Sequence, residues 1–396
     1  MLFASGPPGT GKTYVVHQEI QRWKAKGARV LFVLSTGQLS SEMRARHPDL
    51  DVDTFHGGLW FYKDLSEALA IMTQYDLIIL DEVSMLTDSQ FEKAAQMWQA
   101  ADKLPAILLL GDFWQLPVID KTARRCDESP LWRANVKGVH FRGQVRCKDK
   151  TLQKKLDTLR TAVPSVAQLR KILKRHRAWT SHAPEAWDVL QLPRKHPDTT
   201  IVTCTRKASA QVNDLATDVL FRDRNKTALG TLPLDYEMNE ANFDQSGKLK
   251  PKIKLEPAMT DLYEGQRIFL TRNLDKDNGF VNGMPATIQS YDPASKCLQV
   301  LTKLGKTLAV HPRTEEVDKH RNATSYPVRL GYSTTVPKIQ GATLPHITLW
   351  LDRPGCRAAA YVALSRAQRD DDYLIAGRVS PKYFVPAQRP RRMHRE

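Results

Sequence analysis

The sequence predicts an α/β protein built on parallel sheets with flanking helices, with a small β-barrel inserted between the strands of the second half. A glycine-rich loop, GPPGTGKT at 6–13, follows the strand-like start MLFA, and short apolar runs alternate with amphipathic stretches along the chain. Strands buried on both faces of a parallel sheet are continuously apolar, and helices connect them. With 396 residues, 41% of them hydrophobic, the chain is long enough for two or more packed domains.

Six apolar runs are predicted to be strands: ARVLFVLS (28–35), DLIILDEV (76–83), AILLLGD (106–112), TTIVTCT (199–205), ITLWLD (347–352) and DYLIAG (372–377). The amphipathic segment 13–27 is typical of a crossover helix. A polar stretch from about 222 to 260 precedes four β-like pieces, QRIFLTRN, PATIQSY, CLQVLTK and KTLAVHP, whose hairpin spacing predicts the inserted barrel. The ending PAQRPRRMHRE is interpreted as a basic tail.

Charge and cysteine usage restrict the partners and the compartment. The chain has 59 Lys and Arg against 43 Asp and Glu, a formal charge of +16. This excess favours a polyanionic partner, because neutralised phosphates release counterions, although a merely basic protein explains it equally well. The five cysteines show no C-x-x-C pair and are interpreted as reduced thiols of an intracellular protein. No run approaches the ~20 apolar residues that span a bilayer, so we expect no membrane partner.

The segment 6–13 has the spacing of a loop that binds nucleotide phosphates. Its glycines allow the backbone to turn its N–H groups toward the phosphates, Lys12 supplies a positive charge, and the Thr13 hydroxyl can ligate magnesium. The strand before it and the helix after it argue against a chance glycine-rich turn. The predicted nucleotide contacts of this loop are Gly6, Pro7, Gly9, Thr10, Gly11, Lys12 and Thr13.

Two further motifs follow buried strands. LIILDE ends in Asp81, predicted to hold magnesium, and Glu82, predicted to orient or deprotonate the attacking water, although acidic pairs after strands also cap helices. In GDFWQLP (111–117), Gln115 is predicted to reach the γ-phosphate region. Phe113 and Trp114 could stack on bases, or both could be ordinary core side chains. No guanine-reading N-K-x-D is present, so ATP is favoured over GTP.

Nine motifs in order along the chain carry a resemblance: STG (35–37), TFHG (54–57), LIILDEVSML, GDFWQLPVI, VRCKD (145–149), TRKASAQVN (205–213), RNLDKDNGFVNGMPATI (272–288), TTVPKIQGATL (334–344) and YVALSRAQ (361–368). Together they resemble superfamily 1 helicases of the 5'-to-3' group, specifically the PIF (petite integration frequency) type, with RecD-like proteins as relatives. The resemblance implies two RecA-like P-loop NTPase domains, at 1–140 and at 141–260 with 316–382. It also implies a wedge segment at about 55–73, an SH3-like β domain at 261–315 and a tail at 383–396.

The resemblance also implies roles for residues outside the phosphate loop. Arg146 and Arg366 become arginine fingers that reach the γ-phosphate, and Gln340 with Gly341 lines the nucleotide cleft. From the residues alone, Arg366 is better explained as a surface helix residue paired with Asp370 at i,i+4. Arg142 is the alternative candidate for the first finger.

DNA contacts are expected from hydroxyl, amide, cationic and flat side chains, because such proteins grip phosphates and stack on bases without reading sequence. For His56 a buried structural histidine is the competing interpretation. The expected DNA-binding residues are Thr36, His56, Phe113, Thr205, Asn282 and Lys338.

The implied function is an ATP-dependent DNA helicase that translocates 5' to 3' on single strands in DNA repair, recombination or genome maintenance. ATP and Mg²⁺ are its expected cofactors, and single-stranded DNA and 5'-tailed duplex its expected partners. We expect a monomeric motor, in the nucleus or mitochondrion if the source is eukaryotic. The alternatives are a degenerate relative that binds DNA without unwinding it and an RNA-directed motor. The family's adenine-reading glutamine segment is not seen before Gly6, which predicts either a segment outside this sequence or relaxed nucleotide selectivity.

Overall fold

The computed structural model describes residues 1–60, 63–116, 123–141, 149–235, 258–318 and 321–387. The chain divides into two compact units, and each is described by itself. Unit 1 comprises Met1–Thr180 and Ile339–Glu396, and unit 2 comprises Ser181–Lys338. In the described ranges, no disulfide joins the cysteines and no helix has the length and apolar character needed to cross a bilayer.

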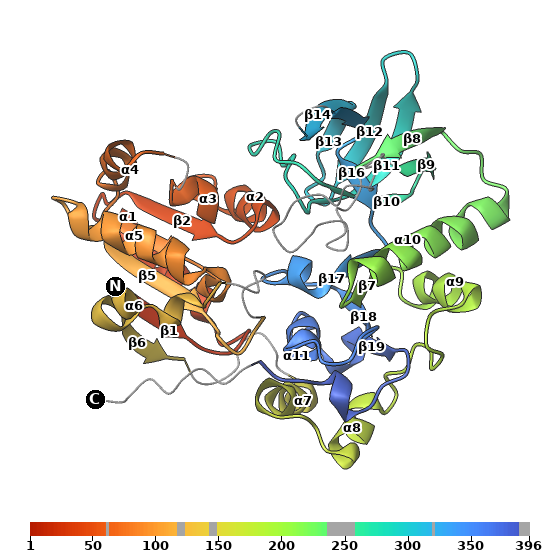
Figure 1. Cartoon of the computed structure of the whole chain (residues 1–396), viewed down its shortest axis with the longest axis horizontal. Helices are drawn as coiled ribbons and strands as arrows, with labels where there is room; N and C mark the ends of the chain where they lie inside the picture. The colour runs from red at the N-terminus through yellow and green to blue at the C-terminus, as the bar shows by residue number, and fades with distance from the viewer. Residues whose placement is uncertain (61–62, 117–122, 142–148, 236–257, 319–320, 388–396) are drawn as a thin grey trace. The chain divides into compact units, whose positions relative to one another are not determined.

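The main sheet of unit 1 has six strands in the order β3 (Asp51–Thr54), β2 (Val30–Leu34), β4 (Leu77–Leu80), β5 (Ala106–Gly111), β1 (Leu2–Ser5) and β6 (Lys137–His140). All its strand pairs are parallel. The strands expected within 28–35, 76–83 and 106–112 are therefore confirmed, and so is the parallel α/β fold class (Figure 1).

Side chains of the central strands alternate between two apolar cores, because successive residues of a strand point to opposite faces. Val30 and Phe32 pack in one core with α1 (Lys12–Lys24) and α2 (Gly37–Arg46). Leu31 and Val33 pack in the other core, which is covered by α3 (Phe55–Gly58), α4 (Leu65–Met72), α5 (Asp88–Ala100) and α6 (Pro130–Asn135). Trp60, in the expected wedge segment, is 6% exposed within this second core.

The rest of unit 1 comes from two distant parts of the chain. One part contains α7 (Lys150–Thr161) and α8 (Val166–Leu173), and the other contains β18 (His346–Trp350), α11 (Ala359–Leu364) and β19 (Tyr373–Ala376). The strands β18 and β19 pair in parallel, as expected from their apolar runs. Every residue of α11 is buried. Short 3-10 helices lie at η1 (Val83–Met85), η2 (Cys126–Glu128), η6 (Asp370–Asp372) and η7 (Pro381–Tyr383).

Unit 2 contains a helical part and a β part. The helical part has α9 (Ala186–Lys195), α10 (Arg206–Leu220) and η3 (Arg222–Arg224) beside the parallel strands β7 (Thr199–Thr203) and β17 (Ser333–Thr335), and η5 spans Val336–Ile339. The β part is an antiparallel sheet in the order β13 (Thr307–Val310), β12 (Cys297–Thr302), β11 (Pro285–Asp292), β10 (Arg267–Leu270) and β16 (Val328–Leu330).

The four β-like pieces expected in the inserted domain are thus strands of one sheet around one apolar core. A fifth strand, β16, comes from beyond the expected limit at residue 315. Two further strand pairs, β8 (Gly230–Leu234) with β9 (Ala258–Leu262) and β14 (Arg313–Asp318) with β15 (Arg321–Ser325), are antiparallel. The polar sequences of β14 (RTEEVD) and β15 (RNATS) concealed these two strands, whereas β8 lies within the stretch 222–260 that was interpreted as polar.

Candidate functional site

Three neighbouring strands of unit 1 deliver the motifs of the site. In the sheet β4 lies beside β5 and β5 beside β1, and all three are parallel. Their carboxyl ends therefore meet at one edge, where ligands bind in open α/β sheets. The phosphate loop follows β1, the pair Asp81–Glu82 follows β4, and Asp112 with Gln115 follows β5. The order of strands, which the sequence does not reveal, brings the three motifs together.

The phosphate loop requires glycine at specific positions. Gly9 and Gly11 have φ angles of 82° and 81°, in the left-handed region that side chains disfavour. A Cβ on Gly6 would lie 3.0 Å from the Phe141 carbonyl oxygen and 2.9 Å from the Thr10 hydroxyl. The buried Thr10 hydroxyl donates to the Pro7 carbonyl at 2.9 Å, which fixes the turn. The loop is therefore shaped by its own backbone and prepared to present N–H groups.

Lys12 begins α1 and lies back over the loop. Its Nζ donates to the Gly6 carbonyl at 2.6 Å and to the Pro7 carbonyl at 3.0 Å. Burial lowers the pKa of Lys12, and the nearby carboxylates, Glu82 first, partly offset this effect. The charge of Lys12 is thus placed between the loop and the acidic pair. The side chain of Thr13, the second expected magnesium ligand, lies outside the described part of the structure.

Glu82 is at the centre of the described contacts. Its backbone is left-handed, with φ 58°, and its N–H donates to Asp81 Oδ1 at 2.8 Å. The amide groups of Gln115 and Gln340 both donate to Glu82 Oε2 over a long 3.5 Å. Gln340 Nε2 is also 3.4 Å from the Ser84 hydroxyl, a contact that the sequence did not suggest. Gln340, expected in the nucleotide cleft, therefore lies against the expected base.

Gly341 also lies close to the expected site. Its φ is 80°, and a Cβ there would lie 2.5 Å from Leu39 Cδ1 in α2. The backbone conformation therefore favours glycine, and a Cβ would also force the Leu39 side chain to move.

Arg366 is buried and contacts the sensor motif. It is 2% exposed, and its Nη2 donates to Gln115 Oε1 at 3.0 Å. Its guanidinium also donates to the Val362 carbonyl at 3.1 Å and to the Ser365 hydroxyl at 2.9 Å. The surface-helix interpretation of Arg366 is wrong, because α11 ends at Leu364 and the side chain turns inward.

The other finger candidates, Arg146 and Arg142, lie outside the described residues.

Asp112 is a functional candidate that sequence reasoning missed. It is 2% exposed, and Arg160 Nη2 donates to it at 2.8 Å while the Tyr361 hydroxyl donates at 3.1 Å. Burial, and then the charge of Asp112, raises the pKa of Tyr361 well above its usual value. The sequence offered one signal for Asp112, which is that it directly follows an apolar strand, as Asp81 does. Nothing in the sequence pointed to Arg160.

The expected DNA-binding threonines cap helices. Thr36 accepts from the Leu39 N–H at 3.3 Å, and Thr205 accepts from the Ala208 N–H at 3.2 Å. Both side chains are half-buried. Each therefore stands at a helix N-terminus, where the backbone N–H groups attract anions such as phosphates.

The remaining expected DNA contacts differ in exposure. His56 is exposed, so the buried-histidine interpretation is wrong. Asn282 is exposed, and its N–H donates to Asn273 Oδ1 at 2.8 Å. Lys338 is half-buried in η5. Thr36 and His56 belong to unit 1, and Thr205, Asn282 and Lys338 belong to unit 2.

Phe113, expected to stack on bases, is half-buried. Its ring packs 5.3 Å from that of Phe3 and 5.6 Å from that of Trp132, and the Arg125 guanidinium lies 4.8 Å from its centre. These neighbours hold the ring at the margin of the apolar core. Trp114 is half-buried, with the Arg160 guanidinium 5.6 Å from its ring centre.

The fold and the site define a phosphate-loop nucleotide-binding protein of the α/β class. A family model described as an AAA domain matches residues 1–121. The chain is similar to the ATP-dependent DNA helicase PIF1 of Danio rerio, with 24% identity over 93% of this chain and 57% of the relative. It is also similar to the helicase Pif1 of Campylobacter jejuni, with 20% identity over 94% of this chain and 88% of the relative. The chain thus spans little more than half of the vertebrate relative.

Solved structures confirm the predicted fold class. The Bacteroides Pif1 helicase in complex with ADP-AlF3 and single-stranded DNA matches with a TM-score of 0.69 and 17% identity, over 97% of this chain and 90% of that one. The Pif1 helicase of Candida albicans matches with a TM-score of 0.69 and 18% identity, over 98% and 92%. The resemblance to PIF-type helicases seen in the motifs is therefore confirmed along nearly the whole chain.

Proposed function

We propose that the chain is an ATP-dependent DNA helicase that moves 5' to 3' along a single strand and unwinds the duplex ahead of it. One observation carries the proposal: the buried Arg366 contacts Gln115, and Gln115 contacts Glu82, beside the phosphate loop. A permanent positive charge, a polar sensor and an acidic residue next to a phosphate-binding lysine are the parts of a phosphoryl-transfer site. The similarity to proteins named DNA helicases supports DNA as the track.

Each part has a defined task in this proposal. Lys12 and the loop N–H groups bind the β- and γ-phosphates, and Glu82 orients the attacking water and accepts its proton. The guanidinium of Arg366 stabilises the negative charge that develops on the transferred phosphoryl group. Gln115, bonded to both Glu82 and Arg366, reports the presence of the γ-phosphate to the segment that carries Arg366. Arg146 would add a second guanidinium.

The residues present fit a nucleotide with magnesium. Gln340 Oε1 is buried and has no hydrogen-bond partner among the described residues, so an acceptor is left over at this edge. No cluster of three or more metal-ligating side chains occurs in the described part of the chain. That agrees with Mg²⁺, which is usually held by one or two protein oxygens together with phosphates and waters. Thr13 and Asp81 would hold the ion, which neutralises charge on the phosphates when bound.

The grip on DNA is proposed for residues in both units. Thr36 and Thr205 offer helix N-termini to phosphates, and His56, Asn282 and Lys338 add side-chain donors. Such contacts recognise the backbone and not the base sequence.

The experiment measures ATP hydrolysis without nucleic acid, with single-stranded DNA and with RNA, followed by unwinding of 5'-tailed, 3'-tailed and blunt duplexes. We expect strong stimulation by single-stranded DNA and unwinding from 5' tails alone. Unwinding from 3' tails alone would contradict the proposed direction. Stimulation by RNA in preference to DNA would indicate an RNA motor, and an absence of turnover would indicate a degenerate relative.

A further inference from the structure

The segment that carries Arg366 is held at both ends by cations of a single helix. Arg366 lies between Tyr361, in α11, and Asp370, in η6. Lys155 of α7 donates to Asp370, more than 200 residues away in sequence. Arg160 of α7 donates to Asp112, which also accepts from the Tyr361 hydroxyl. None of the sequence motifs pointed to α7, which begins directly after the segment 142–148.

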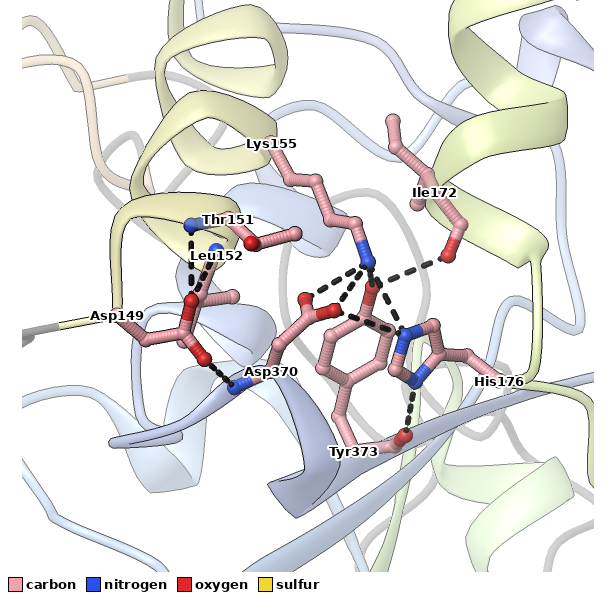
Figure 2. A network of polar contacts seen from close by, with 8 residues as sticks. All are labelled: Asp149, Thr151, Leu152, Lys155, Ile172, His176, Asp370 and Tyr373. Atoms are coloured by element: carbon pink, nitrogen blue, oxygen red, sulfur yellow. Dashed lines mark hydrogen bonds and ion pairs between the residues drawn. The ribbon is translucent and has the colours of Figure 1, made fainter.

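The first end is a buried polar network (Figure 2). Lys155 is 9% exposed, and its Nζ donates to Asp370 Oδ1 at 2.7 Å, to Oδ2 at 2.8 Å and to the Tyr373 hydroxyl at 3.0 Å. His176 Nε2 lies 3.0 Å from the same Nζ, and the His176 ring stacks on Tyr373 with centroids 4.3 Å apart. Asp149, the N-cap of α7, accepts from the Asp370 N–H at 2.9 Å. Side chain and backbone of Asp370 are thus both fixed to α7.

At the second end, Tyr361 is held by the carboxylate of Asp112. This carboxylate accepts from Arg160 of α7 and from the Tyr361 hydroxyl, and its Oδ1 also accepts the Trp114 N–H at 3.1 Å. Asp112 therefore joins α7, α11 and the turn that bears Gln115. Arg366 itself donates to Gln115. The Gln115 side chain and the Arg366 guanidinium are therefore both positioned relative to the Asp112 carboxylate.

We propose that α7 positions Arg366 for catalysis, with Lys155 acting through Asp370 and Arg160 acting through Asp112 and Tyr361. The inference rests on the proposed ATP hydrolysis. These side chains touch no phosphate; they determine where the guanidinium lies. A buried ion pair is a poor device for stability alone, because desolvation offsets its attraction, but it defines one geometry. Displacement of a catalytic group by about 1 Å costs on the order of a hundredfold in rate.

The test compares Asp370→Asn and Tyr361→Phe with the matched control Asp127→Asn in the whole protein. Asp127 forms a similarly buried pair with Arg125, elsewhere in unit 1. Steady-state hydrolysis with saturating single-stranded DNA should show kcat lowered by about 10- to 100-fold in Asp370→Asn, with KM for ATP nearly unchanged. Tyr361→Phe removes one hydroxyl and should lower kcat by a smaller factor. The control should match the wild type, and thermal unfolding should show all variants folded.

The decisive measurement places both substitutions in an Arg366→Ala background. If Asp370 and Tyr361 act through Arg366, the double variants should be no slower than Arg366→Ala alone, because effects of residues that act as a unit are not additive. A further loss of kcat in the double variants, or an unchanged kcat in both single variants, would overturn the inference and leave the helicase proposal intact. A wild-type protein without hydrolysis, or Arg366→Ala at the wild-type rate, would overturn both.

Discussion

At the scale of single residues, Glu82 combines an unusual backbone with a central place in the site. A non-glycine residue with φ 58° costs about 1 kcal/mol or more, and such conformations concentrate at functional positions. Its carboxylate meets two buried amides, Gln115 and Gln340. The fold thus maintains a strained residue at the position proposed for the general base.

Glu82→Gln should therefore remove the base while leaving the binding groups in place. We expect turnover of ATP to fall by about a hundredfold or more, with nucleotide affinity close to that of the wild type. Measured kcat and an independent binding titration with ATP give the two values. Equal hydrolysis by the variant and the wild type would exclude Glu82 as the base.

Lys12→Ala should have the opposite signature. Loss of the ammonium removes charge-assisted bonds to the phosphates, and we expect nucleotide affinity to fall by about 10- to 100-fold. A fluorescent nucleotide titration measures this, with Lys26→Ala on the exposed end of the same helical region as the control. Unchanged affinity would show that the loop N–H groups alone hold the phosphates.

Single residues could be predicted from the sequence where they lie within a recognisable motif. Lys12, Asp81 and Glu82 were found because each directly follows a glycine-rich turn or an apolar strand. The contact between Asp112 and Arg160 appeared only with the structure, because it joins positions 48 residues apart. No local pattern encodes such a long-range partner.

At the scale of elements, α7 contributes two buried cations to unit 1. The Arg160 side chain is 16% exposed and faces Asp112, which is 2% exposed. Burial alone would lower the pKa of Arg160, and the neighbouring Asp112 and Tyr361 outweigh this effect and raise it. The guanidinium of Arg160 therefore keeps its positive charge beside Asp112.

Arg160→Met should lower the free energy of unfolding by about 3–5 kcal/mol, because the buried Asp112 carboxylate would lose its cationic partner. Urea unfolding followed by circular dichroism measures the loss. The control is Arg22→Met. Arg22 pairs with Glu19 at the surface, where the two side chains are 72% and 38% exposed, and such a pair contributes at most about 1 kcal/mol. Equal stability of the two variants would show that water reaches Asp112.

The predictability of strands followed their burial. Continuously apolar strands such as β2 and β4 were predicted from their composition, since burial on both faces requires it. The edge strand β6 is exposed along its whole length, and β3 reads DVDT. In β3 only Val52 is apolar and packs in the core, so neither strand carries a continuous apolar signal that would have predicted it.

At the scale of the whole molecule, the limits of the two compact units differ from the domain limits expected from the sequence. The segments 150–180 and 339–382, expected in the second motor domain, are grouped with unit 1. The expected domain limits remain predictions, because apolar runs identify strands but not the sheet that takes them. The formal charge of +16 is likewise a property of the whole chain.

That charge leads to a prediction about salt. If DNA is held mainly through its phosphates, each neutralised phosphate releases condensed counterions, and the logarithm of the affinity falls linearly with the logarithm of the salt concentration. With about six phosphates engaged, affinity for single-stranded DNA should fall by about 10²- to 10³-fold between 50 and 200 mM salt. Fluorescence anisotropy with oligonucleotides of mixed sequence, of thymine alone and of adenine alone measures this slope. We expect the slope to be nearly the same for all three, because the contacts are to the backbone. A shallow slope together with a strong preference for one oligonucleotide would show that bases and not phosphates carry the grip.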